Sequence, residues 1–309
     1  MDAAQLRPLS IGEILDVAIK IYQARFAHLV MAVAVVVGPV SLVGALIQAS
    51  AAPDTDEFLT TTDTAVGSSV DFGDFWGLAA GFLLSALLGF IAAEIATAAS
   101  FKLVSGAYLD TDPDWRESLR FATSRLRSLV WLSIVSGVLM GLAFLACIVP
   151  GVYFYGAWAV AVPVLLLEEH RGRRALKRSR ELVTGRWWPT VVAIVVATIL
   201  GSIVSGIFSG ILLAALLVGD NALVEAIGQA VATTAASVLT TPFTAAVIAV
   251  LYFDLRVRKE GFDLELLARR VGVEPPAGGP PGILPPSGEP PQGEPPFWPP
   301  PPGWRPPDA

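Results

Sequence analysis

Apolar and polar positions follow one another along this chain in long blocks. Six apolar runs stand out, at about 26–49, 75–100, 129–149, 152–167, 190–218 and 222–253. A helix rises ~1.5 Å per residue, so roughly 20 apolar residues cross a ~30 Å hydrocarbon core, and most of these runs reach that length. The pattern therefore predicts an all-α fold, a polytopic membrane helix bundle with six transmembrane helices.

Prolines and polar connections divide these runs. Pro150-Gly151 separates the third run from the fourth so closely that we expect the turn of a helical hairpin there. The fourth run is short, and Pro163 is expected to kink it. Pro39 and Pro242 also fall inside predicted helices, where each frees a backbone carbonyl. Residues 102–128, which carry four arginines, predict a cytoplasmic connection.

The first 25 residues predict a cytoplasmic amphipathic helix that precedes the membrane domain, 26–260. Ser10 and Glu13 have the spacing of a capping box, in which each side chain bonds a free backbone N–H. Apolar residues then recur at helical spacing, with charged residues on the other side of the helix. Two placements stay open: the helix lies flat among lipid headgroups, or it packs against the protein's own cytoplasmic loops.

Residues 261–309 predict a cytoplasmic, proline-rich, disordered tail. Pro-Pro pairs recur every five residues from position 275 to position 295. Proline lacks an N–H and fixes φ, so this stretch is expected to form an extended polyproline II segment. Phe297, Trp298 and Trp304 favour a protein partner at its end, and a passive spacer is the alternative.

Composition and charge agree with a membrane protein and predict its orientation. Hydrophobic residues make up 54% of the 309, charged residues 16%, and the mean hydropathy is +0.63; soluble domains average about 25% charged residues. Lys and Arg are absent between Arg25 and Lys102, where the acidic loop 50–74 lies, whereas seven of them occupy 168–188. Because cytoplasmic loops are enriched in Lys and Arg, we expect a multi-pass protein of the plasma membrane with both termini cytoplasmic.

The basic segment supplies the main candidate binding site. Anionic headgroups attract basic residues next to the membrane by about 1 kcal/mol each. Ala175, Leu176, Ser179, Leu182 and Val183 share one helical face opposite the charges, which predicts a helix lying on the membrane surface. The inner surface is expected to include Arg256, Arg258 and Lys259 as well. The candidate headgroup-binding residues are Arg171, Arg173, Arg174, Lys177, Arg178 and Arg180.

Glu94 is the intramembrane polar candidate, because an ionisable group inside a membrane helix costs ~3 kcal/mol to insert. It lies near the predicted cytoplasmic end of its helix, within reach of Lys102 or interfacial water, and the alternative is the wall of a transport cavity. Cys147 and two histidines do not form a catalytic or metal-binding set. We therefore expect no enzyme activity, no cofactor and no nucleic-acid partner. The expected partners are anionic membrane lipids, a protein for the tail and a second copy of the chain.

Three stretches carry a family resemblance: RPLSIGEILDVAIKIYQARF at 7–26, PGVYFYGAWAVAVPVLLLEE with ALKRSRELVTGRWW in the middle, and LYFDLRVRKEGFDLE at 251–265. They resemble a bacterial membrane family named for its similarity to the membrane domain of glycerophosphoryl diester phosphodiesterase. In those enzymes a separate soluble barrel carries the chemistry, and this chain has no soluble segment long enough for a barrel of ~250 residues. The resemblance therefore implies a membrane fold and brings no catalytic residues.

Taken together, these features predict a non-enzymatic integral membrane protein, a scaffold or envelope-associated factor with a basic, lipid-facing cytoplasmic surface. The alternative is a transporter or lipid-handling protein that uses Glu94 and the proline-containing helices.

Overall fold

The computed structural model describes residues 9–51, 72–108, 111, 113–168, 172–216 and 222–261. All regular secondary structure in these ranges is helical: α1 (Ile11–Ala24), α2 (Phe26–Ala51), α4 (Phe72–Tyr108), α5 (Trp115–Ala146), α6 (Ile148–Ala157), α7 (Ala161–Leu167), α8 (Arg173–Val183), α9 (Trp187–Leu216) and α10 (Ala222–Glu260). By length and composition, six helical segments are able to cross a membrane, with α6 and α7 together making one of them. The predicted all-helical fold with six membrane-length apolar segments is thereby confirmed.

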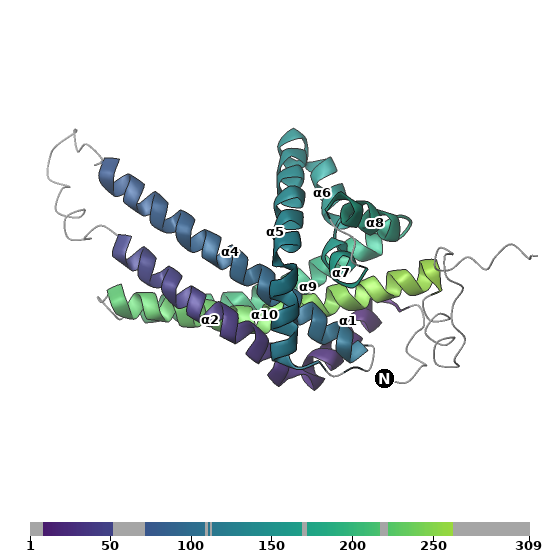
Figure 1. Cartoon of the computed structure of the whole chain (residues 1–309), viewed down its shortest axis with the longest axis horizontal. Coiled ribbons are helices and arrows are strands. Elements are labelled where there is room, and N and C mark those ends of the chain that lie inside the picture. Colours follow the sequence, from purple (N-terminus) through teal and green to yellow (C-terminus); the bar gives the residue numbers. More distant parts are fainter. Residues whose placement is uncertain are drawn as a thin grey trace, which may run out of the picture.

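The second half of α10 lies at the centre of the molecule. Its residues from Ala245 to Leu255 are almost all buried, including Tyr252 and Phe253. The helix contacts α1, α2, α4 and α9, and α2 runs between α4 and the first half of α10 (Figure 1). The Phe253 ring stacks on Tyr108 of α4 with a centroid separation of 4.3 Å. The bundle is therefore built around one long helix whose last turns carry both core residues and charges.

The hairpin α5–α6 rises away from this bundle (Figure 1). Between α4 and α5 it leaves a groove of about 1200 Å³, lined mainly by apolar side chains such as Phe90, Trp131 and Ile134. The turn of the hairpin is at Cys147, which is extended (φ −171°, ψ 149°). The prediction of a turn at Pro150-Gly151 is wrong, because a proline in the first turn of a helix lacks only an N–H that has no intrahelical partner there.

The fourth apolar run is interrupted before Pro163 rather than at it. The chain leaves the helix at Trp158 and re-enters it after Val160, so that Pro163 stands in the first turn of α7. A proline ring clashes with the carbonyl four residues earlier, and this clash prevents a continuous helix from α6 into α7. The proline thus sets where the next helix begins.

The expected connection 102–128 is mostly helix. α4 continues to Tyr108, and α5 begins at Trp115, whose N–H donates to the Asp114 carboxylate at 2.8 Å. At 37 residues α4 is about 55 Å long, well beyond a ~30 Å hydrocarbon core. The apolar runs are thus the middle parts of longer helices.

The amphipathic helix α1 packs against the protein itself. The capping box is confirmed: the Ser10 N–H donates to Glu13 Oε2 at 2.7 Å, and the Glu13 N–H donates to Ser10 Oγ at 3.4 Å. Ile14, Ala18 and Ile21 are buried, and α1 contacts α10 and α9. α1 therefore packs against the protein itself, on helices rather than on the loops that the sequence suggested. The predictions for the tail beyond residue 261 and for the loop 52–71 lie outside the described residues.

Candidate functional site

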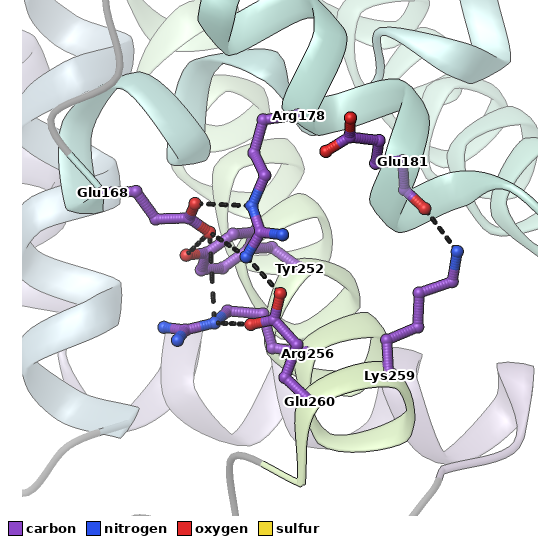
Figure 2. A network of polar contacts seen from close by, with 7 residues as sticks. All are labelled: Glu168, Arg178, Glu181, Tyr252, Arg256, Lys259 and Glu260. Atoms are coloured by element: carbon purple, nitrogen blue, oxygen red, sulfur yellow. Dashed lines mark hydrogen bonds and ion pairs between the residues drawn. The ribbon is translucent and has the colours of Figure 1, made fainter. Parts of the chain in front are cut away.

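An ion-pair network joins α7, α8 and α10 (Figure 2). It consists of Glu168, Arg178, Tyr252, Arg256 and Glu260. Arg178 Nε donates to Glu168 Oε2 at 2.7 Å, and its Nη2 donates to Glu260. The Tyr252 hydroxyl donates to Glu168 Oε1 at 2.8 Å, and Arg256 Nε donates to Glu260 Oε2 at 2.9 Å. Two carboxylates and two guanidinium groups thus alternate in space.

The network is shielded from solvent and electrically balanced. The side chains of Glu168 and Glu260 are only 11% and 8% exposed. Burial by itself would lower the pKa of Arg178, but its bonds to Glu168 and the charge of Glu260 outweigh burial and raise that pKa. Every carboxylate has a cationic partner, so the network carries no free base and is suited to holding α8 in place.

A second charged cluster ties the start of the described chain to α10. The Leu9 N–H donates to Asp254 Oδ1 at 2.7 Å, while the Leu9 carbonyl accepts from Arg258 Nη2 at 2.7 Å. Arg258 Nε also donates to Asp254 Oδ2 at 2.9 Å, and Asp254 is buried. The first and last stretches of the family resemblance therefore meet in space.

The apolar face of the basic helix α8 is covered by the protein itself. Its apolar face is buried inside the protein, so the prediction that this face rests on the membrane is wrong. The reason is that α6, α7 and α10 offer it an apolar surface within the fold. The cations opposite are exposed at Arg173, Arg174, Lys177 and Arg180.

The six headgroup candidates therefore separate into different environments. Arg178 belongs to the ion-pair network, and Arg171 lies outside the described residues. Arg180 lies over the Tyr153 ring, 5.9 Å from its centroid. Arg256 and Arg258, expected on the basic inner surface, are half-buried and paired with acids, whereas Lys259 is exposed.

Glu94 is half-buried and faces α5. Its carboxylate is hydrogen-bonded to the Ser133 side chain. The Lys102 ammonium lies instead over the Phe121 ring, 5.4 Å from its centroid. Glu94 is thus bonded to a neighbouring helix rather than to the lysine that the sequence offered as its partner.

A polar cleft of about 290 Å³ lies between α2, α4 and α10. Glu94 is not among its lining residues. Gln48 Nε2 donates to Ser85 Oγ across the cleft at 3.2 Å. In the part of the chain that the structure describes, the hydroxyls of Ser237 and Thr241 have no hydrogen-bond partner. The polar side chains that line the cleft are Ser41, Gln48, Ser85, Gln229, Thr233, Ser237 and Thr241.

Sequence reasoning did not find the ion-pair network or the polar cleft. A signal for the network was present as the i, i+4 pair Arg256/Glu260 at the end of the last apolar run, and Asp254/Arg258 was the corresponding signal for the second charged cluster. No group of three potential metal ligands occurs among the residues with a described position.

Comparison with protein families finds one match. Residues 121–273, just under half of the chain, are similar to a domain of unknown function, DUF8558. The match extends from α5 through α10 and includes the whole ion-pair network. No curated protein matches the chain. No solved structure matches it either.

Proposed function

We propose that this chain is a non-enzymatic integral membrane protein, a scaffold or envelope-associated factor, that recruits anionic phospholipid to its cytoplasmic face. The membrane setting is supported by the outer surfaces of its long helices. Large apolar side chains point outward there, for example Phe82 (65% exposed), Leu145 (86%) and Ile199 (53%). Apolar surface of this extent promotes aggregation in water and matches the lipid hydrocarbon.

The proposed orientation follows from the positions of the charges. The basic helix α8 and the charged end of α10 adjoin each other, and they lie away from the ends of α2 and α4 that flank the acidic loop (Figure 1). With α8 on the cytoplasmic side of a plasma membrane, both termini are cytoplasmic and the acidic loop is outside.

The observation that carries the proposal is the fixed outward presentation of Arg173, Arg174 and Lys177. Retention of positive loops in the cytoplasm does not require these loops to be rigid. Here the buried apolar face and the Arg178 pairs hold α8 in place, and Arg173, Arg174 and Lys177 are exposed on its other side. Because the backbone of α8 is already fixed, no further backbone entropy is lost when its cations meet phosphate groups.

The test is lipid retention by the purified full chain, measured by native mass spectrometry with equal amounts of phosphatidylglycerol and phosphatidylcholine. We expect the wild type to prefer phosphatidylglycerol. The triple change Arg173→Gln, Arg174→Gln and Lys177→Gln should lower that preference at least tenfold, at about 1 kcal/mol per cation. Lys20→Gln on α1 is the control, because Lys20 is exposed but lies on another helix. An unchanged preference in the triple variant would refute the proposal.

A second candidate function, transport of a small polar solute or lipid, is favoured by the polar cleft. Unpartnered hydroxyls between membrane-length helices need water or a ligand to satisfy them. The test replaces Ser237 by Cys in a Cys147→Ser background and applies a membrane-impermeant maleimide. Labelling at position 237 supports an aqueous path, and lack of labelling rejects it. Leu139→Cys on the exposed apolar surface of α5 serves as the unreactive control.

A further inference from the structure

A second cationic surface lies between the α8–α9 turn and the end of α10. The two segments border an open pocket of about 540 Å³. Three basic side chains line it, Arg186 from the turn and Arg258 and Lys259 from α10. The pocket wall also includes Leu255 and Val257, which are buried. Residues more than seventy positions apart in the sequence thus form one basic pocket.

The charges around this pocket are only partly compensated. Arg258 is paired with Asp254. Lys259 donates to the main-chain carbonyl of Glu181, which is a neutral acceptor (Figure 2). The negative charges of Glu181 and Glu260 attract the Lys259 ammonium. Glu260, however, is also bonded to Arg178 and Arg256, so its charge is shared among three cations.

Arg186 is the third basic residue of the pocket and adds to its positive charge. No acid is paired with it within the described ranges, and it is half-buried beside Gly185, whose φ of +88° turns the chain into α9. Among the described residues, an anion in the pocket would therefore meet the Arg186 guanidinium, with no acid paired to it there, and the Lys259 ammonium. Charge-assisted hydrogen bonds from such groups are the usual way in which proteins hold phosphate.

The surroundings of the pocket favour a lipid as the source of the phosphate. α9 begins at Trp187, directly after Arg186, and the partial positive charge of a helix N-terminus adds to the attraction. Trp188 is 72% exposed, as expected for a tryptophan at headgroup depth. Further along α9, Val192, Val195 and Ile199 form an exposed apolar stripe at helical spacing, which offers apolar contact to an acyl chain.

We propose that this pocket binds the phosphate group of a phospholipid headgroup, with the acyl chains along α9. The inference deepens the proposed function and rests on its membrane orientation. It differs from general attraction to negative charge, because it requires a phosphate at a defined position. Arg186 and Lys259 are the ligand-binding residues. Arg258 lines the pocket but is needed for the contact with Leu9, and it is therefore not a suitable test position.

The experiment compares phosphatidylglycerol with a diacylglycerol succinate of the same acyl chains, again on the detergent-purified full chain by native mass spectrometry. Both lipids carry one negative charge, and only the first has a phosphate. We expect the wild type to bind phosphatidylglycerol about tenfold more tightly, with Arg186→Gln and Lys259→Gln each removing most of that difference. Arg173→Gln removes the same charge outside the pocket and should leave the difference intact. Arg186→Lys should retain part of it.

Each other outcome rejects some part of the inference. Equal binding of the two lipids by the wild type, or full selectivity in both glutamine variants, would show that no phosphate site exists there. Displacement of the lipid by sn-glycerol 3-phosphate at low millimolar concentration would assign the pocket to a soluble phosphate ester and overturn the lipid source. A preference for phosphatidylglycerol over phosphatidylcholine without phosphate selectivity would leave the proposed function standing and remove only the pocket. Selectivity for phosphate over succinate, without a preference for phosphatidylglycerol over phosphatidylcholine, would keep the pocket and reject the proposed function.

Discussion

The substitution Arg178→Met tests whether the ion-pair network holds α8 in place. It removes the hydrogen bonds to Glu168 and Glu260 and leaves two largely buried carboxylates with one guanidinium, that of Arg256. Removing one partner of a buried ion pair typically costs about 3–5 kcal/mol, because the remaining charge stays buried and unpaired. The Arg178 side chain is 22% exposed, and Arg256 still compensates part of the charge, so we expect a loss of about 2–3 kcal/mol.

The assay is thermal unfolding of the detergent-purified protein, followed by the fluorescence of its tryptophans. For a protein of this size, 1 kcal/mol shifts Tm by roughly 2–4 °C, so we expect a decrease of about 5–10 °C. Lys177→Met is the matched control, since it removes the same charge from the adjacent position. Lys177 is 81% exposed and its ammonium lies 3.8 Å from the Glu181 carboxylate, a geometry worth at most ~0.5 kcal/mol.

In lipid binding the order of the two variants should be reversed, with Lys177→Met showing the larger effect. Lys177→Met should weaken the preference for phosphatidylglycerol, because Lys177 faces outward. Arg178→Met should leave that preference intact as long as the protein is folded. Equal Tm values for the two variants, within about 1 °C, would refute the structural role assigned to the network.

Two further changes probe packing elsewhere. Gly156→Ala should destabilise the protein by about 1–3 kcal/mol, because its Cβ would lie 2.5 Å from the Trp187 indole nitrogen; Gly141→Ala, at an open position, should be neutral or stabilising in the same melting assay. Asp254→Ala should lower Tm by several degrees, because the Leu9 N–H loses its acceptor and the half-buried Arg258 loses its acidic partner. Asp16→Ala on the exposed side of α1 should have little effect. Equal melting within either pair would contradict the packing described.

The sequence predicted local structure best where one physical requirement dominates. Long uncharged runs have to be helical if they are to cross a membrane, and six such segments are found. The Ser10–Glu13 pair predicted the start of α1 because the capping box is formed by residues three positions apart. The hairpin turn at Cys147 was missed, because Pro150 is compatible with the first turn of a helix.

The sequence alone determined the all-helical class, the position of the apolar segments and the separation of charge, because these follow from helix rise, hydropathy and local capping. The tertiary structure decided which helix faces are buried and which charged side chains are paired. The apolar face of α8 is buried in the protein, Arg178 bonds Glu168 and Glu260, and Arg186 and Lys259 border the same pocket. These contacts join residues distant in the chain, and the same pattern of apolar and basic positions is compatible with lipid on either face of the helix. Only the packing of α8 against α6, α7 and α10 shows that its apolar face is covered by protein.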